Sequence, residues 1–277
     1  MARLFVTDLD GTLLSSNIAL SGYSAGKIKE LIQSGVNITY STSRSFYTAS
    51  MLLKDAGFKL PCITFNGVYV IMSETGEVVK KNLLSREIYD AVLGIGREMG
   101  LRPYIFGKDS KGEEKLLYQH PDSEAQSRYI AERRKRNDKR LTADDGSCKL
   151  AELININYLY PLDLTQRLKS KIEKECPRDI SIKVIRDIYN EGYFSLEVSN
   201  KDANKGKMLE YTADLLKIPL EDVTVFGDQA NDIEMFEKAG TRVAVENAAD
   251  ELKAKADFIT ECNDRDGVVK YILKTLF

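Results

Sequence analysis

The sequence predicts an α/β protein with a doubly wound, Rossmann-like parallel-sheet core and an inserted α+β cap domain. Short apolar runs alternate with helical patterns near both ends of the chain, which is the order of parallel strands joined by helices. The middle of the chain instead holds strand patterns next to one another, which favours an antiparallel α+β unit. A length of 277 residues also favours two domains over a single core.

The first strand pattern leads directly into two acidic residues. The apolar run at residues 4–6 is typical of a strand buried in a parallel sheet, and Asp8 and Asp10 follow it. Gly11 then allows the chain to turn sharply. Because ligands of such sheets bind at the carboxyl ends of the strands, we expect both carboxylates to lie in a site.

The pair of Asp8 and Asp10 indicates a particular chemistry. Two neighbouring carboxylates repel each other unless one holds a proton or a cation lies between them. Magnesium prefers oxygen ligands and often binds one or two carboxylates together with a phosphate. An aspartate can attack phosphorus to form an aspartyl phosphate, and a second aspartate can act as general acid and then as general base.

The next elements have the order expected for right-handed parallel crossovers. Ser21 begins a helical pattern that Gly35 ends, and Gly57 ends a second helix. Thr75-Gly76 predicts the turn of a hairpin. The predicted elements are a helix at 21–35, a strand at 36–40, a helix at 45–56, a strand at 62–65 and hairpin strands at 68–72 and 77–80.

The pattern changes at about Leu83. We expect residues 83–191 to form the inserted cap, and residues 1–82 and 192–277 to form the core. The elements predicted from here to residue 198 are a helix at 85–99, strands at 102–106 and 115–118, a helix at 122–136, a strand at 152–160, a helix at 162–175, and strands at 181–186 and 193–198.

The alternation of strands and helices returns after Ser199. The predicted elements are a helix from about Lys205, a strand at 223–226, a helix, a strand at 241–245, a helix from Ala248, a strand at 258–259 and a terminal helix.

Other polar residues fall at the same predicted sheet edge. Thr42 lies just past the second strand, where its hydroxyl and nearby backbone N–H groups are suited to hold a phosphate oxygen. Lys205 opens a helix, and its ammonium is a compact positive charge for phosphate or carboxylates. Asp228 and Asp232 follow the strand at 223–226, and their spacing brings them together around a strand-to-helix turn. One of them can ligate a metal while the other orients its water or Lys205.

These stretches together resemble the motifs of the haloacid dehalogenase superfamily, whose members are mostly phosphatases. Asp8-Leu9-Asp10-Gly11-Thr12 is similar to its first motif, and Gly227-Asp228 with Asn231-Asp232 is similar to its last. Family members often have Thr-Gly-Arg where this chain has Thr42-Ser43-Arg44, so the glycine is missing. Asn204-Lys205-Gly206 is similar to the family's lysine motif.

The resemblance covers nearly the whole chain and is closest to the Cof-like branch. The cap is inserted between the second and third motifs, as in that branch, and Asn66-Gly67 matches the branch at the mouth of its site. Val245-Glu246-Asn247-Ala248 and Asp266-Gly267-Val268 also match.

The resemblance implies a role for each matching residue. Asp8 is the expected nucleophile, and Asp10 is the expected general acid and base. The expected Mg²⁺ ligands are Asp8, Asp228 and the backbone carbonyl of Asp10, with Asp232 as a supporting carboxylate. The expected phosphate-binding residues are Leu9, Thr42, Ser43, Lys205 and Asn231. The candidate substrate contacts are Arg44, Asn66 and Gly67.

We therefore predict a magnesium-dependent phosphatase, a phosphoric monoester hydrolase of small phosphorylated metabolites and foremost of sugar phosphates. A phosphomutase or another phosphoryl-transfer enzyme is an alternative, which the release of free phosphate would distinguish. A catalytically silent sensor that binds a sugar phosphate is a second alternative, but Asp8, Asp10 and Asp228 are all present. A dehalogenase is disfavoured because carbon chemistry does not need a metal site.

Composition limits the partners and the compartment. A net charge of −2 gives no general attraction to nucleic acid or anionic membrane, and no apolar run approaches the roughly 18 residues of a membrane span. The scattered cysteines and the lack of a signal-peptide pattern indicate free thiols in the cytoplasm. We expect a monomer or a small homo-oligomer. We predict no site role for His120, and a solvated helix end for the basic run at 132–140.

Overall fold

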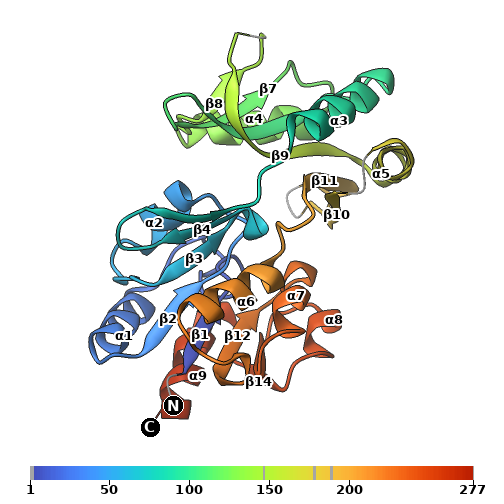
Figure 1. The fold of residues 1–277 in the computed structure, drawn as a ribbon. Coiled ribbons are helices and arrows are strands. Elements are labelled where there is room, and N and C mark those ends of the chain that lie inside the picture. The colour runs from blue at the N-terminus through green and yellow to red at the C-terminus, as the bar shows by residue number, and fades with distance from the viewer. Residues whose placement is uncertain (1–2, 146, 177–178, 188–189, 277) are drawn as a thin grey trace. The chain divides into compact units, whose positions relative to one another are not determined.

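The computed structural model describes residues 3–145, 147–176, 179–187 and 190–276. The chain divides into a core unit, Met1–Lys81 with Ala203–Phe277, and a cap unit, Asn82–Asp202 (Figure 1). The second boundary falls after Asp202 and not after residue 191, because strand β11 (Tyr193–Asn200) pairs with other strands of the cap unit. The predicted fold class, a parallel α/β core with a separate α+β insertion, is confirmed.

The core sheet has the strand order β14-β13-β12-β1-β2, and every neighbouring pair is parallel. Every residue of β1 and β12, in the middle of the sheet, is buried. Burial on both faces explains why these strands have continuous apolar sequences in place of alternating ones. The strands are β1 (Leu4–Thr7), β2 (Asn37–Tyr40), β12 (Val223–Gly227), β13 (Thr241–Val245) and β14 (Phe258–Thr260).

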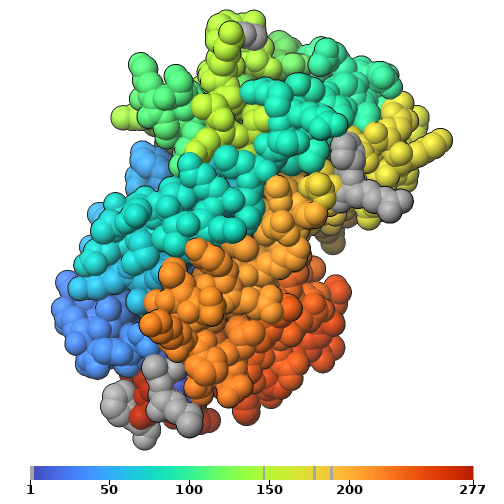
Figure 2. All heavy atoms as spheres, viewed as in Figure 1, coloured from blue at the N-terminus to red at the C-terminus, as the bar shows by residue number. Residues whose placement is uncertain are grey.

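Helices cover the core sheet, and polar caps begin several of them. The side chains of Ser21, Ser45 and Asn204 each accept a hydrogen bond from a backbone N–H three residues later, which confirms the predicted helix starts. Helix α1 contacts α9, and α6 contacts α7. Figure 1 shows α6 in front of the strands, and its outer residues form part of the orange surface in Figure 2. The helices are α1 (Gly22–Gln33), α2 (Phe46–Leu53), α6 (Lys205–Leu215), α7 (Ile233–Phe236), α8 (Asp250–Lys253) and α9 (Gly267–Leu276).

One expectation about the core sheet is only partly correct. The order of elements predicts the strand at 62–65 as the third parallel strand, but it belongs to a separate antiparallel sheet of order β3-β4-β5. It still lies beside the end of β2 in the predicted parallel direction, through an isolated parallel bridge between Ser41 and Ile63 and a hydrogen bond from the Thr39 hydroxyl to the Pro61 carbonyl at 2.7 Å. Phe65, Asn66 and Gly67 all have positive φ, so the chain reverses there and β4 folds back on β3. The strands are β3 (Pro61–Thr64), β4 (Tyr69–Met72) and β5 (Val78–Lys81), and the last two form the predicted hairpin.

The cap sheet has the order β10-β11-β9-β6-β7-β8 and is antiparallel except for the pair β7 and β8. Strand β8, which is only 3 residues long, has no counterpart among the predicted elements. The strands are β6 (Tyr104–Asp109), β7 (Glu114–Tyr118), β8 (Leu141–Ala143), β9 (Leu150–Pro161), β10 (Ile180–Arg186) and β11.

The cap helices lie on both faces of this sheet. Ile105 and Ile156 belong to one apolar cluster, whereas Tyr104 and Leu159 belong to another. Because alternate residues of a strand point to opposite faces, the two clusters lie on opposite sides of the sheet. Helices α3 (Arg86–Glu98) and α5 (Leu162–Glu175) contribute to the first cluster, and α4 (Glu124–Lys135) contributes to the second.

The prediction that the basic run at 132–140 is a solvated helix end is wrong for two of its arginines. Arg140 is only 9% exposed, and its guanidinium donates to the Asp138 carboxylate at 2.8 and 2.7 Å. Arg133 donates to the same carboxylate at 3.0 Å and lies over the ring of Tyr129. Glu114 adds a further ion pair with Arg140 at 3.5 Å. The carboxylates make the full or partial burial of these cations favourable, and the sequence of the run does not show that Asp138 pairs with both arginines.

Replacement of Asp138 with asparagine is expected to destabilise the protein at neutral pH. Burial raises the pKa of Asp138, but the hydrogen bonds and charge of Arg140 outweigh that effect and lower the pKa from 3.8 to about 2. A carboxyl with a depressed folded-state pKa contributes stability above its unfolded pKa, and this contribution disappears as the pH falls from about 4 to about 2. We expect the variant to lose about 1–2 kcal/mol of unfolding free energy at pH 7 after screening by solvent is allowed for, measured by urea denaturation.

The matched control is Asp90→Asn, an exposed carboxylate on α3. It should leave the unfolding free energy at pH 7 unchanged within about 0.5 kcal/mol. Equal stability of the two variants at pH 7 would show that the Asp138 cluster contributes nothing.

Candidate active site

Polar residues gather at the carboxyl ends of the core strands. Thr7, the last residue of β1, lies opposite Tyr40 of β2 and Phe226 of β12. Asp8, Thr42 and Asp228, which follow these strands, therefore come to one edge of the sheet, as the sequence predicts.

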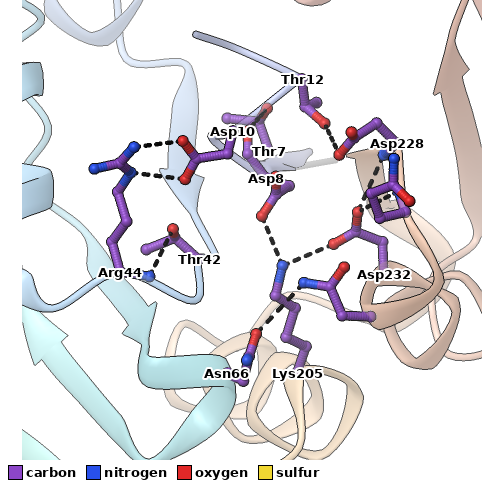
Figure 3. Close-up of polar contacts among 12 residues, drawn as sticks. Thr7, Asp8, Asp10, Thr12, Thr42, Arg44, Asn66, Lys205, Asp228 and Asp232 are labelled. Atoms are coloured by element: carbon purple, nitrogen blue, oxygen red, sulfur yellow. Dashed lines mark hydrogen bonds and ion pairs between the residues drawn. The ribbon is translucent and has the colours of Figure 1, made fainter. Parts of the chain in front are cut away.

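A buried ammonium joins two of the carboxylates. Lys205 is fully buried, and its Nζ donates to Asp8 Oδ1 at 2.6 Å and to Asp232 Oδ1 at 2.7 Å (Figure 3). Burial by itself lowers the pKa of Lys205, but the charges of Asp232 and Asp8 outweigh this effect and raise the pKa above its ordinary value. The ammonium is therefore charged and fixed between two carboxylates.

The position of Lys205 depends on a close approach of two backbone segments. Asn204 caps the N-terminus of α6, and Gly67 packs against its backbone. Gly67 has φ of 101°, and a Cβ there would lie 2.5 Å from the Asn204 nitrogen. Only glycine satisfies both conditions. In this structure Gly67, a candidate substrate contact, thus also supports the start of the helix that carries Lys205.

Three buried carboxylates form a compact acidic cluster. Asp8, Asp228 and Asp232 each have a carboxylate oxygen within 4.8 Å of the others. Burial raises the pKa of Asp8 well above its ordinary value, and the nearby Asp232 and Asp228 add to this effect against the opposing charge of Lys205. Burial and the charge of Asp232 raise the pKa of Asp228 to about 7. If all three carboxylates were ionised, the single positive charge of Lys205 would not balance their negative charge.

The members of the cluster differ in how many hydrogen bonds they already accept. Asp232 accepts from Lys205 through one oxygen, and its other oxygen accepts from the backbone N–H groups of Asp228 at 3.0 Å and Gln229 at 3.2 Å. The supporting role of Asp232 stays a prediction. Asp8 accepts from Lys205 through Oδ1, whereas Asp228 accepts from Thr12 through Oδ1 and also interacts with the Gln229 side chain.

The turn after Asp10 packs tightly on Asp228. Thr12 Oγ1 donates to Asp228 Oδ1 at 3.0 Å. Gly11 has φ of 74°, and a Cβ there would lie 2.3 Å from Asp228 Oδ2, so only glycine fits. Thr12 belongs to the motif Asp-Leu-Asp-Gly-Thr, but the sequence alone does not assign it this contact.

Asp10 faces a different partner. Its carboxylate accepts two hydrogen bonds from Arg44, from Nε at 2.7 Å and from Nη2 at 2.5 Å (Figure 3). The predicted role of Arg44 as a substrate contact stays a prediction. In this structure its guanidinium determines where the Asp10 carboxylate lies.

The loop after β2 is held by backbone hydrogen bonds. The N–H groups of Phe65 and Asn66 donate to the carbonyls of Arg44 and Thr42, each at 3.0 Å. Thr42 is fully buried, and its Oγ1 accepts from the Arg44 N–H at 3.1 Å. These bonds fix the Thr42 hydroxyl next to the cluster at the sheet edge.

Three other predicted phosphate-binding residues have distinct environments. Asn231 Nδ2 donates to the buried Asn66 Oδ1 over 3.4 Å, a long hydrogen bond. Leu9 is fully buried and its carbonyl accepts from the N–H groups of the turn that follows, whereas Ser43 is exposed. The roles of these residues stay predictions.

Sequence reasoning missed one acidic neighbour of the site. Glu234 of α7 accepts a hydrogen bond from the Lys205 backbone N–H at 3.2 Å. Its position two residues after Asp232 was the only available signal.

His120 is exposed in the cap unit, and among the described residues no helix is long and apolar enough to span a membrane.

Comparisons with known proteins place the whole chain in one group. A family model of haloacid dehalogenase-like hydrolases matches residues 5–272. The 5-amino-6-(5-phospho-D-ribitylamino)uracil phosphatase YwtE of Bacillus subtilis strain 168 is 27% identical over 98% of this chain and 96% of its own length. The HMP-PP phosphatase of Yersinia pseudotuberculosis is 25% identical over 98% of this chain and 94% of its own. The crystal structure of TM0651 from Thermotoga maritima is similar with a TM-score of 0.78 and 26% identity, covering 99% of this chain and 97% of that one.

Proposed function

Since the chain belongs to the haloacid dehalogenase-like hydrolases and is similar over its whole length to phosphatases, we propose that it is a magnesium-dependent phosphatase of small phosphorylated metabolites, foremost sugar phosphates. The observation that carries this proposal is the buried cluster of Asp8, Asp228 and Asp232 around Lys205. The name of the Bacillus relative describes a substrate with phosphate on a ribityl group, which supports a sugar-like substrate.

The donor set fits a magnesium ion. The oxygens of Asp8 and Asp228 are hard ligands of the kind that Mg²⁺ binds, and both carboxylates are only 5% exposed. Burial, together with the charge of the neighbouring carboxylates, raises the pKa of both groups, which is the environment that a bound cation would relieve. Asp8, Asp228 and the Asp10 backbone carbonyl would hold the ion, which when bound would neutralise charge on the phosphate and the carboxylates.

In the proposed first step, an Asp8 carboxylate oxygen attacks phosphorus. A bond forms between Asp8 and phosphorus while the bond to the ester oxygen breaks. The Thr42 hydroxyl and the Lys205 ammonium stabilise the non-bridging oxygens, because phosphoryl transfer depends mainly on positioning and charge. Asp10 donates a proton to the leaving alkoxide, which requires that its carboxyl first separate from the Arg44 guanidinium, and the products are an alcohol and an aspartyl phosphate.

In the proposed second step, water breaks the aspartyl phosphate. The Asp10 carboxylate, now without its proton, accepts a proton from water as the water oxygen attacks phosphorus. The bond between Asp8 and phosphorus breaks, which releases inorganic phosphate and restores the Asp8 carboxylate. We further propose that side chains of the cap unit select the leaving group.

The test is phosphate release from a panel of phosphorylated sugars, nucleotides and pyridoxal phosphate, with magnesium and with EDTA. We expect release from a few related sugar phosphates, and a loss of at least about 100-fold with EDTA because the acidic cluster then lacks its counter-charge. Restoration of the rate by added magnesium is the control for damage by the chelator. Phosphorus NMR of the same reactions would reveal a phosphomutase, which moves phosphate between hydroxyls without releasing it.

The opposite result is also informative. If the folded protein with magnesium releases phosphate from none of these compounds and transfers none, the phosphatase proposal is wrong. Binding of a sugar phosphate without turnover would then favour the silent sensor.

A further inference from the structure

Two asparagines that the proposed chemistry does not use contact the turn after Asp10. Asn247 lies just past β13, and its Nδ2 donates to the Gly11 carbonyl oxygen at 2.7 Å. Asn263 is the first residue of a short 3-10 helix, Asn263–Arg265, in the loop after β14, and its Nδ2 donates to the Leu14 carbonyl oxygen at 2.9 Å. The two are joined, because the Asn263 backbone N–H donates to Asn247 Oδ1 at 3.0 Å.

The two asparagine contacts add to the hydrogen bonds that the turn makes within itself. Within the turn, the N–H groups of Thr12, Leu13 and Leu14 all donate to the single carbonyl of Leu9. The carbonyls of Gly11 and Leu14 instead accept from the two asparagine side chains, which come from distant parts of the chain, 236 and 249 residues away. A turn held by such amide contacts has fewer accessible conformations than one bound by water alone.

The segment that carries Asn247 also contacts the backbone of Asp228. The Ala249 N–H donates to the Asp228 carbonyl oxygen at 2.8 Å. The turn itself contacts Asp228 through Thr12 Oγ1 and the close approach of Gly11. Residues 247–249 therefore contact both the turn and the Asp228 backbone. They fix the position of the turn relative to Asp228.

The loop after β14 attaches the chain beyond the turn in the same way. Asp264 accepts from the Ser16 N–H at 2.8 Å and from its hydroxyl at 2.7 Å. Asp266 accepts from the hydroxyls of Ser21 and Ser24 at 2.5 and 2.7 Å. The loop thus contacts residues on the far side of Leu14 as well as Leu14 itself.

We propose that Asn247 and Asn263 are positioning residues that fix the turn at residues 9–14 against Asp228. The proposal gives a role to Val245-Glu246-Asn247-Ala248, which the proposed reaction leaves without one, and its catalytic consequence rests on the proposed function. Asp8 leads directly into this turn and Asp10 lies within it, so its displacement moves the nucleophile and the acid relative to Asp228. A displacement of about 1 Å at a reacting group can reduce a rate about 100-fold.

Asn247→Ala is the first test because Asn247 is exposed and its loss leaves the core packing intact. We expect kcat for the best substrate to fall about tenfold to 100-fold while KM stays within about twofold. Amide hydrogen exchange of residues 9–14 should become faster, because a local opening that the side chain opposes becomes easier. Asn247→Asp should lose as much activity, since a carboxylate can still accept from Asn263 but cannot donate to the Gly11 carbonyl.

The matched control is Asn37→Ala. Asn37 Nδ2 donates to the Arg3 carbonyl at 3.2 Å, next to the start of β1, so the variant removes a similar amide-to-carbonyl bond at the other end of that strand. It should leave kcat and the exchange of residues 9–14 unchanged. Asn263→Ala should act like Asn247→Ala on both readouts.

Two outcomes would overturn the inference. One is an unchanged exchange rate of residues 9–14 in Asn247→Ala, and the other is faster exchange with kcat within twofold of the parent protein. If the parent protein releases no phosphate at all, the proposed function fails separately, and the exchange measurement alone decides whether the asparagines fix the turn.

Discussion

Asp8→Asn is expected to abolish phosphate release while leaving the fold intact. The amide nitrogen of asparagine is not a nucleophile toward phosphorus, so no covalent intermediate can form. We expect kcat to fall by at least about 10⁴-fold, because loss of a nucleophile removes the step on which the others depend. The measurement is phosphate release with magnesium from the best substrate of the panel.

Stability measurements separate this loss of chemistry from unfolding. The new asparagine side chain would keep an oxygen that accepts from Lys205, and the change removes a carboxylate whose pKa burial raises well above the ordinary value. The midpoint of thermal unfolding in the absence of magnesium should therefore stay the same or rise. Asp55→Asn, an exposed change in the same core unit, should keep full activity. Full activity in Asp8→Asn would contradict the nucleophile assignment.

Lys205→Met should have the largest effect on stability. Methionine fills a similar volume, but it leaves Asp8 and Asp232 buried without the ammonium that now donates to both. Removal of one partner from a buried ionic group typically costs about 3–5 kcal/mol, because the remaining charge stays desolvated. We expect a fall of this size in the unfolding free energy from urea denaturation without magnesium, together with loss of phosphate release.

Two further variants test the cause. Lys207 lies two residues after Lys205 on the same helix and is exposed. The variant Lys207→Met should change the free energy of unfolding by less than about 0.5 kcal/mol. The double variant Asp8→Asn with Lys205→Met should be more stable than Lys205→Met alone, since one uncompensated carboxylate is gone. If Lys205→Met is as stable as the parent protein, the buried ion pairs contribute nothing to folding.

Much of the fold could be predicted because its signals are local. Ser21, Ser45 and Asn204 begin helices where the pattern of cap and apolar face predicts them. The helix at Leu162–Glu175 and the strand at Thr241–Val245 have the bounds that the pattern predicts. Each of these elements depends on residues within a few positions of one another in the chain.

Pairing between strands was less predictable. The strand Pro61–Thr64 has the apolar sequence of a core strand, but its neighbour in space is decided by the chain reversal at Phe65–Gly67. The predicted second domain boundary falls too early because the partners of Tyr193–Asn200 lie far back in the chain. Periodicity shows that a strand exists but not which strand it pairs with.

For the site, the residue pattern alone specifies which chemical groups are present and at which sheet edge they fall. Asp8 and Asp228 follow apolar strands, and parallel strands bring their ends together. Their partners are defined only in the folded chain, which places Lys205 between two carboxylates, Arg44 on Asp10, and Asn247 on the turn after it. The two kinds of information differ in range. A strand and its terminal residue are set by neighbouring residues, whereas hydrogen bonds between segments far apart in the chain form only once the sheet has brought those segments together.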